Sequence, residues 1–143
     1  MSGFGDWVTA SDDARLTDPG TAGAPWVGIV DDDDSLRTAL ARALRVNGIR
    51  VETFGSAEEF LRREVAGEPD CIILDIHLGG LSGFDLQDRL AAQGLTPPII
   101  FITAHEEMLG ARARSHGASG YLRKPFETNA LVALLRPHLR ASH

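Results

Sequence analysis

Acidic side chains are concentrated at one point of the sequence, where four consecutive aspartates at residues 31–34 follow a short apolar run. A second apolar run later in the chain ends at Asp75. Two carboxylates held ~4 Å apart would repel each other by about 4 kcal/mol at an effective dielectric of ~20. A hard divalent cation offsets this repulsion, and Mg²⁺, which retains several waters, suits a site that receives a phosphate group. The first two aspartates of the run, Asp31 and Asp32, and Asp75 are therefore candidate Mg²⁺ ligands.

Two other polar side chains, Thr103 and Lys124, stand at or near the ends of the next apolar runs, and Lys124 is the only lysine in the chain. With a metal ion to screen an incoming phosphoryl group, Asp75 is placed to act as a nucleophile and to form an acyl phosphate. Lys124 would pair with the phosphoryl oxygens as a point charge, and Thr103 would donate a hydrogen bond to them. Taken alone, Lys124 would be an ordinary surface lysine, so this chemistry depends on a fold that brings the residues together.

The elements that position these residues follow from the alternation of short apolar runs with helical patterns after residue 25. Strands are expected at residues 26–30, 50–54, 71–74, 99–102 and 120–122, and helices at about 35–46, from 56, 84–93, 106–116 and 128–140. Strict alternation with short connections predicts an α/β fold, a doubly wound five-stranded parallel sheet with helices on both faces. In the flavodoxin-like strand order 2-1-3-4-5, ligands bind at the carboxyl ends of the strands, where the strand order reverses. All the candidate residues would meet at that rim.

Residue types near the expected helix ends predict where the helices begin and finish. Asp34 or Ser35 is the expected N-cap of the first helix, while Asp33 is expected in a solvated loop. The stretch 56–59, Ser-Ala-Glu-Glu, has the capping-box pattern that begins a helix. Pro137 is expected to disturb the final turn of the last helix, because proline has no backbone N–H to donate.

Composition and charge restrict the classes of protein that the chain fits. With 143 residues, 43% of them hydrophobic and 24% charged, it is expected to form one globular domain over residues 26–143. Residues 1–25, rich in Gly, Ser, Thr, Asp and Pro and without apolar periodicity, are expected to form a flexible N-terminal extension. A net charge of −6 argues against direct binding of nucleic acid or of an anionic membrane. A single cysteine, with neither a ~20-residue apolar segment nor a secretory signal, predicts a cytoplasmic protein.

Four pieces of the sequence, "IVDDD", "IILDIHLGGLSG", "IIFITAH" and "GYLRKPF", occur in this order on the expected strands. In these pieces and in their separations, the chain resembles the receiver domain of two-component response regulators over residues 26–140. The residues in these pieces are most similar to those of receivers that precede LuxR-type DNA-binding domains. The resemblance implies that a histidine kinase or a phosphotransfer protein phosphorylates Asp75 in a Mg²⁺-dependent reaction. The domain would assist this reaction as a phosphoacceptor regulator, not as an enzyme.

The resemblance also implies roles for the other matching positions. Mg²⁺ would be held by three carboxylates and one backbone carbonyl, which belong to Asp31, Asp32, Asp75 and, for the carbonyl, His77. Thr103 and Tyr121 would form the switch, in which the hydroxyl moves toward the phosphoryl group and the ring turns inward to fill the vacated space. The Lys124–Pro125 peptide bond would be cis, as is common at this motif. The altered face would act on a downstream protein partner or an output domain outside this chain, or through a phosphorylation-dependent dimer.

The sequence departs from the receiver pattern in the loop that follows Asp75. Receivers commonly have Met-Pro where this chain has Leu78-Gly79, so the loop is expected to be more mobile. His77 and His105 lie two residues beyond Asp75 and Thr103, where receiver side chains flank the phosphoryl group and tune attack by water. They are either two partly exposed histidines without a special role or residues that set the phosphoryl lifetime. In the second case the lifetime would depend on pH near ~6.5, the ordinary pKa of an imidazole.

Two other functions use similar residues. A Mg²⁺-dependent phosphohydrolase of the haloacid dehalogenase type has the same chemical parts, but its nucleophilic aspartate comes first and its metal-binding acids come late. Here the acidic run comes first, and Asp75 is followed by Ile76 and His77, which leaves no second aspartate to act as a general acid. A pseudo-receiver that serves only as an interaction module is disfavoured by the intact Asp75, Thr103 and Lys124. Because the N-terminal extension begins with its own methionine, a single-domain regulator is expected in preference to a receiver cut from a longer protein.

Overall fold

The computed structural model describes residues 25–64, 67–105 and 117–140, in which strands and helices alternate along the chain. The strands are β2 (Val27–Val30), β3 (Val51–Phe54), β4 (Cys71–Asp75), β5 (Ile99–Thr103) and β6 (Gly120–Arg123). The helices are α1 (Asp34–Val46), α2 (Ala57–Leu61), α3 (Gly83–Ala92) and α5 (Thr128–Leu135), and the 3₁₀ turn η3 (Arg136–His138) follows α5. The helix predicted at residues 106–116 and the predicted extension, apart from residue 25, lie outside the described residues.

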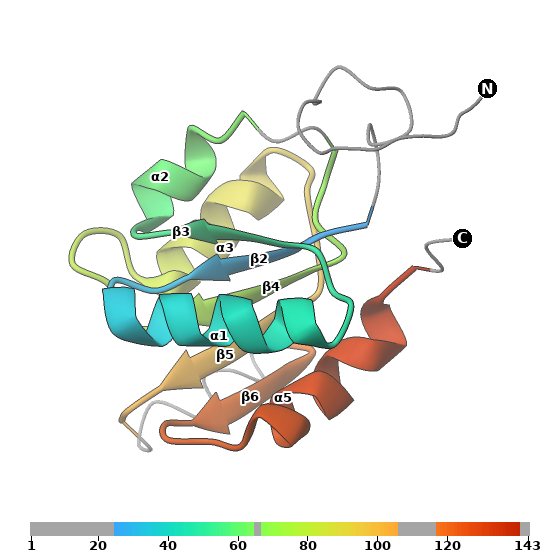
Figure 1. Ribbon diagram of the computed structural model, residues 1–143. Helices are drawn as coiled ribbons and strands as arrows, with labels where there is room; N and C mark the ends of the chain where they lie inside the picture. The colour runs from blue at the N-terminus through green and yellow to red at the C-terminus, as the bar shows by residue number, and fades with distance from the viewer. Residues whose placement is uncertain (1–24, 65–66, 106–116, 141–143) are drawn as a thin grey trace.

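The five described strands form one parallel sheet in the order β3-β2-β4-β5-β6, which is the predicted order 2-1-3-4-5 (Figure 1). The register pairs Val30 with both Phe54 and Leu74, and Asp75 with Ile102. The residues that follow β2 and β4 therefore meet at one edge of the sheet, where the strand order reverses. The predicted fold class is confirmed, and each strand limit lies within one residue of its predicted position.

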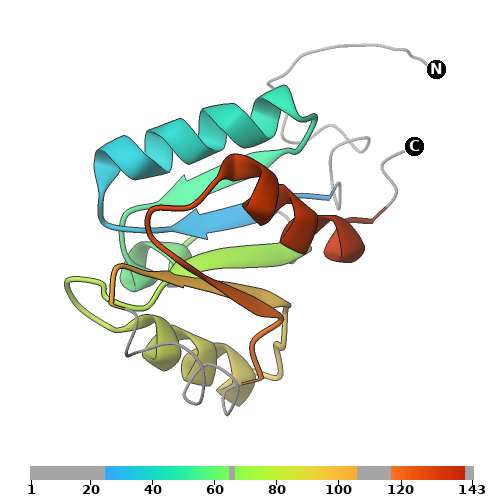
Figure 2. The ribbon, with the colours of Figure 1, turned by 90° about the horizontal axis from the view of Figure 1, so that it is seen from below.

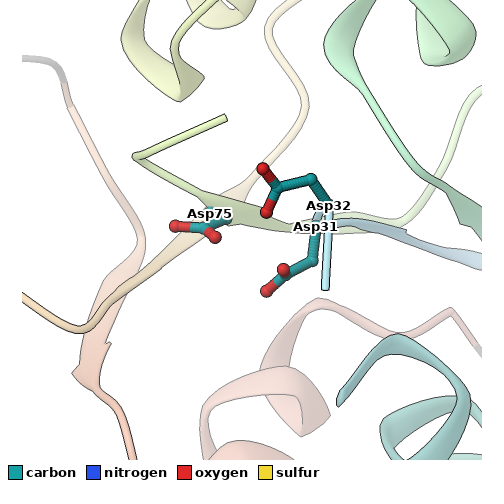
Figure 3. A group of neighbouring side chains, drawn as sticks. All are labelled: Asp31, Asp32 and Asp75. Carbon is teal, nitrogen blue, oxygen red and sulfur yellow. The ribbon is translucent and has the colours of Figure 1, made fainter. Parts of the chain in front are cut away.

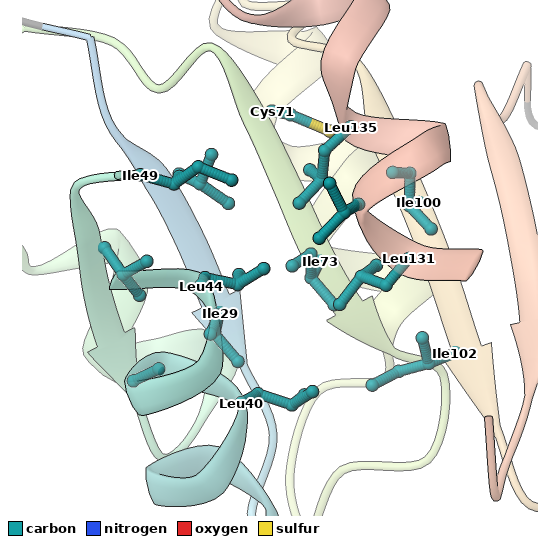
Figure 4. Close-up of a cluster of buried hydrophobic side chains, with 14 residues drawn as sticks. Ile29, Leu40, Leu44, Ile49, Cys71, Ile73, Ile100, Ile102, Leu131 and Leu135 are labelled. Carbon is teal, nitrogen blue, oxygen red and sulfur yellow. The ribbon is translucent and has the colours of Figure 1, made fainter. Parts of the chain in front are cut away.

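Helices cover both faces of this sheet, with α1 and α5 on one face and α2 and α3 on the other (Figures 1 and 2). Under α1 and α5 the core is largely aliphatic, and Ile29, Leu44 and Ile73 are fully buried there together with Leu131 (Figure 4). The opposite core is richer in aromatic rings: Trp26, Phe54, Phe60, Phe84 and Phe101. Full burial of each such side chain contributes roughly 1.5–3 kcal/mol. Because the central strands are covered on both faces, their polar residues occur only at their ends.

The first turn of α1 shows why the acidic run does not fold as predicted. The Asp31 carboxylate accepts the N–H of Asp33 at 2.9 Å, which holds Asp33 in an extended conformation at φ −86° and ψ 104°. From there the Asp33 carboxylate accepts the N–H of Leu36 at 3.1 Å and caps the helix. The prediction that Asp34 or Ser35 is the N-cap is wrong by one or two residues. Asp34 is already helical, and Asp33 is both exposed and the cap.

The predicted signals at the other helix ends are met in part. Ser56 accepts the N–H of Glu59 at 3.0 Å and caps α2 as predicted, but the Glu59 carboxylate accepts the N–H of Gly55 at 2.6 Å. In a complete capping box Glu59 would accept the N–H of Ser56 itself, so here the carboxylate binds the N–H of the residue before the N-cap. Pro137 lies in η3, so the predicted disturbance after α5 is confirmed. None of the helices within the described ranges is long and apolar enough to cross a membrane.

Candidate functional site

Three carboxylates converge where β2 and β4 end. Asp31 and Asp32 follow β2 directly, Asp75 is the last residue of β4, and their nearest oxygen atoms lie within 4.8 Å of one another (Figure 3). Asp31 and Asp75 are buried, whereas Asp32 is exposed to solvent. A cluster that offers only oxygen ligands, with one side open to water, fits a hard divalent cation such as Mg²⁺ that keeps part of its water shell. The structure thus brings together the three carboxylates that the sequence singled out.

The Lys124 ammonium lies between the two buried carboxylates. Its Nζ is 2.9 Å from Oδ2 of Asp31 and 3.1 Å from Oδ2 of Asp75. The residue is held there by its backbone, because its N–H donates to the Thr103 carbonyl at 2.7 Å. The Lys124–Pro125 bond is cis, as the resemblance implied. Burial alone would lower the pKa of Lys124, but the hydrogen bonds and charges of the two carboxylates outweigh burial and raise it. The side chain therefore carries its positive charge at neutral pH.

Ionisation of the Asp75 carboxyl is less favourable in the folded protein than in water. Burial raises its pKa above the ordinary 3.8, and the nearby negative charge of Asp31 raises it further. The ammonium of Lys124 and the N–H of His77, which donates to Asp75 Oδ1 at 3.0 Å, act in the opposite direction without cancelling the increase. A carboxylate destabilised in this way gains from any added positive charge, which is the property expected of a metal ligand.

Replacement of Asp75 by asparagine is expected to raise the thermal stability of the metal-free protein at pH 7 by a few degrees. Since the folded-state pKa lies above the unfolded value, ionisation of Asp75 opposes folding. The penalty is absent below the ordinary pKa, grows as the pH rises from the ordinary pKa to the raised folded-state pKa, and is constant above it. Thermal unfolding in EDTA from pH 4 to 8 measures it, with the exposed Asp32→Asn as the matched control. A lower melting temperature for Asp75→Asn at pH 7 would contradict the electrostatics described here.

The two predicted switch residues lie on neighbouring strands near this cluster. Thr103 ends β5 and is fully buried, and its Oγ1 accepts the N–H of His105 at 3.0 Å. Tyr121 is paired in register with Phe101, and its side chain remains 39% exposed on β6. The hydroxyl and the ring therefore belong to paired strands, with the ring on the outside of the sheet edge.

His77 and His105 lie against each other at the rim, with ring centroids 4.3 Å apart and ring planes inclined by 63°. The same backbone geometry produces both positions. Each N–H donates to the side chain two residues earlier, His77 to Asp75 and His105 to Thr103, at the ends of neighbouring parallel strands. The two histidines were predicted to flank the same group, and contact between their rings is an addition that spacing alone does not predict.

Two residues at the rim were not predicted to belong to the site. The guanidinium of Arg37 donates to the Asp31 carbonyl at 2.5 Å and pairs with Asp34. The spacing of Asp34 and Arg37, three residues apart on a helix, is a usable signal for that ion pair. Glu58 of α2 accepts the N–H of Leu81 at 3.3 Å across 23 residues of sequence. The only local signal at Glu58, an acidic residue in the first turn of a helix, has no bearing on that contact.

Comparison with known proteins gives matches over the same part of the chain. The family model of the response regulator receiver domain matches residues 27–136. Nodulation protein W of Bradyrhizobium diazoefficiens is 41% identical over 107 residues, which are 74% of this chain and 47% of that protein. The transcriptional regulatory protein FixJ of Azorhizobium caulinodans is 36% identical over 117 residues, 81% of this chain and 56% of that protein. The chain spans about half the length of the curated relatives it matches.

Solved structures show the same similarity in three dimensions. The response regulator StyR superposes with a TM-score of 0.74 at 41% identity, covering 82% of this chain and 60% of that one. The response regulator TrrA of Thermotoga maritima, solved in complex with Mg²⁺-BeF, has a TM-score of 0.71 at 26% identity, covering 80% of this chain and 99% of that one. The strand order, the acidic cluster and the sequence similarity therefore agree over one and the same region.

Proposed function

We propose that this chain, which belongs to the response regulator receiver domain family, accepts a phosphoryl group on Asp75 and passes the signal on by a change of conformation. The observation that carries the proposal is the position of the buried Asp75 carboxylate, which shares a rim with Asp31, Asp32 and the Lys124 ammonium. The donor would be a histidine kinase or a phosphotransfer protein, as for two-component regulators generally. Incubation with a small-molecule phosphodonor and Mg²⁺, with Asp75→Asn as the control, tests the proposal.

The chain's own residues supply the acceptor and part of the compensating charge. A carboxylate oxygen of Asp75 forms a bond to phosphorus, while the bond from phosphorus to the donor's imidazole nitrogen breaks and its electron pair stays on the nitrogen. Lys124 already lies beside this carboxylate and can pair with the phosphoryl oxygens that arrive there. When bound by the three carboxylates and the backbone carbonyl of His77, Mg²⁺ supplies positive charge that screens the carboxylates from the incoming phosphoryl oxygens. The domain in this proposal assists its own phosphorylation but turns over no separate substrate.

The response to phosphorylation is proposed to pass through Thr103 and Tyr121. The Thr103 oxygen already accepts the N–H of His105, so its own hydroxyl hydrogen is available to donate to a phosphoryl oxygen. A shift of that hydroxyl toward Asp75 would vacate space beside β6, and the half-exposed Tyr121 ring would turn inward to fill it. The two arrangements differ in the outer face of β6, which is the surface that a partner would distinguish.

His77 and His105 are proposed to set the lifetime of the phosphoryl group, because their rings contact each other and their backbone N–H groups donate to Asp75 and Thr103. The double replacement His77→Asn with His105→Glu removes both rings and adds a carboxylate that can orient a water molecule. We expect the phosphoryl half-life to shorten by about 10-fold or more. Decay of the adduct between pH 5.5 and 8 measures this, with His138→Asn in η3 as a control remote from the rim. If the double variant had the same phosphoryl half-life and the same pH profile as wild type, these histidines would not set the lifetime.

The output of the receiver is proposed from its relatives. Several of them, including FixJ and TdiR, are named transcriptional regulatory proteins, and this chain covers about half their length. Residues 26–143 are the proposed receiver, and its output is proposed to be a domain outside this chain, a downstream partner, or a phosphorylation-dependent dimer in the cytoplasm. The net charge of −6 supports an output that does not involve direct contact of this domain with nucleic acid or an anionic membrane. The phosphohydrolase alternative is not favoured, because the family match covers the region that holds the site.

A further inference from the structure

The loop between β4 and α3, which we call the β4–α3 loop (residues 76–82), is tied to the neighbouring helix α2. Its sequence has Leu78-Gly79 where receivers commonly have Met-Pro, and Gly80 follows, so the position of the loop needs a cause other than proline. Glu58 of α2 provides a contact, because its Oε2 accepts the N–H of Leu81 at 3.3 Å. A Cβ atom at Gly80 would lie only 2.6 Å from the same oxygen, so the carboxylate rests directly against the loop backbone. The absence of a side chain at Gly80 therefore leaves the space that the Glu58 carboxylate occupies.

The tied part of the loop lies next to the acidic cluster. A Cβ atom at Gly79 would be 3.9 Å from Oδ2 of Asp32, so a side chain at this position would come into ordinary contact with a candidate metal ligand. At the start of the loop, the N–H of His77 donates to Asp75. At its end, the N–H of Gly83 donates to the Ile76 carbonyl at 3.0 Å. Between these two backbone contacts, the Glu58 carboxylate of α2 contacts the middle of the loop at Leu81.

We propose that Glu58 is a positioning residue that holds the β4–α3 loop over Asp32 and Asp75, and with it the backbone carbonyl of His77 that contributes to Mg²⁺ binding. The proposal rests on the proposed function of the site, since it assigns the loop a part in metal binding. Glu58 acts through the loop, because among the described residues the carboxylates close enough to share one ion are those of Asp31, Asp32 and Asp75. Groups that orient metal ligands in this way typically change metal affinity by about 10- to 100-fold when removed.

The neighbouring residue Glu59 provides a matched control. It lies on the same short helix, carries the same charge, and makes a backbone hydrogen bond of its own, to the N–H of Gly55 at 2.6 Å. Its contact is with the β3–α2 connection and not with the β4–α3 loop. Glu59→Ala therefore removes one carboxylate and one hydrogen bond from α2 without releasing Leu81. Glu58→Gln separates charge from hydrogen bonding, because the amide retains an acceptor oxygen.

Two measurements test the proposal: hydrogen exchange at the Leu81 amide, and calorimetric titration with Mg²⁺. In Glu58→Ala we expect exchange at Leu81 to be about 10-fold faster and Mg²⁺ to bind about 10-fold more weakly. Glu58→Gln and Glu59→Ala are expected to stay within about 2-fold of wild type in both measurements. Adding Gly79→Pro to Glu58→Ala stiffens the loop independently and is expected to recover Mg²⁺ affinity. Thermal unfolding of each variant establishes that it is folded before the two quantities are compared.

The outcomes separate this proposal from the proposed function. Unchanged exchange at Leu81 in Glu58→Ala would overturn the tether whether or not the protein binds Mg²⁺. Faster exchange with unchanged Mg²⁺ affinity would overturn the positioning role. If Mg²⁺ affinity fell equally in Glu58→Ala and Glu58→Gln, the effect would come from the charge of Glu58 and not from its hydrogen bond. That result would also overturn the positioning role. Failure of wild type itself to bind Mg²⁺ contradicts the proposed function, and exchange at Leu81 would still decide whether Glu58 holds the loop.

Discussion

Replacement of Lys124 by methionine is expected to lower the free energy of unfolding by about 3 kcal/mol in metal-free buffer. The Lys124 ammonium lies 2.9 Å from Asp31 and 3.1 Å from Asp75, and both of these carboxylates are buried. Methionine keeps the apolar stem of the side chain but leaves two like charges without a cation between them. Removing one partner from a buried ion pair costs ~3–5 kcal/mol, and the partial exposure of Lys124 favours the lower end of that range.

The same replacement is expected to increase the stabilisation that Mg²⁺ provides, because the metal would then be the only cation between the carboxylates. Urea unfolding of wild type and Lys124→Met, in EDTA and in excess Mg²⁺, measures both effects. The double variant Lys124→Met with Asp31→Asn should recover part of the lost stability, since one of the two like charges is gone. If Lys124→Met were as stable as wild type in EDTA, the assignment of Lys124 as the compensating charge would be wrong.

Replacement of Gly83 by alanine is expected to destabilise the protein by about 2–3 kcal/mol and to weaken Mg²⁺ binding. A Cβ atom at Gly83 would lie 2.5 Å from the carbonyl oxygen of Asp75 and 3.1 Å from Cα of Ile76. Both are backbone atoms at the end of β4, so the added methyl group forces apart the start of α3 and the strand that carries Asp75. The hydrogen bond from Gly83 N–H to the Ile76 carbonyl would be strained by the same displacement.

A matched control for this change lies four residues earlier in the same connection. A Cβ atom at Gly79 would meet its nearest heavy atom, Asp32 Oδ2, at 3.9 Å, which is ordinary contact. Gly79→Ala should therefore stay within about 0.5 kcal/mol of wild type. Chemical denaturation of the two variants, together with Mg²⁺ titration, gives the comparison. Equal stability of Gly83→Ala and Gly79→Ala would show that helix α3 does not press on Asp75 as described.

The strand ends are the part of this molecule that sequence reasoning predicts well. Wholly apolar runs that end in Asp31, Asp75 and Thr103 indicate strands buried on both faces, and their alternation with helices leaves few possible sheet orders. Once the order is fixed, the carboxyl ends must share one rim, and no knowledge of side-chain packing is needed to place these residues together. The clustered carboxylates suggested Mg²⁺, whereas the family resemblance added the phosphoryl donor, the downstream partners and the switch, none of which follows from periodicity.

What sequence reasoning missed depends on contacts between elements. The N-cap of α1 is Asp33 and not Asp34 or Ser35, because the Asp31 side chain accepts the Asp33 N–H. Residue preferences alone do not distinguish between neighbouring aspartates. Glu58 reaches Leu81 across the space between α2 and the β4–α3 loop, where helix propensity and capping patterns carry no information. The mobility of this loop stays a prediction, and the absence of a Cβ at Gly80 is what leaves room for the Glu58 carboxylate beside the loop backbone.

The most direct test of the account is the intact mass of the protein after incubation with a small-molecule phosphodonor and Mg²⁺. We expect one phosphoryl adduct on wild type, stable in acid and labile in base, as an acyl phosphate on Asp75 requires. The adduct should be absent from Asp75→Asn and should not form in EDTA. Absence of any adduct on wild type, or an adduct that persists in Asp75→Asn, would contradict the claim that Asp75 is the phosphoryl acceptor.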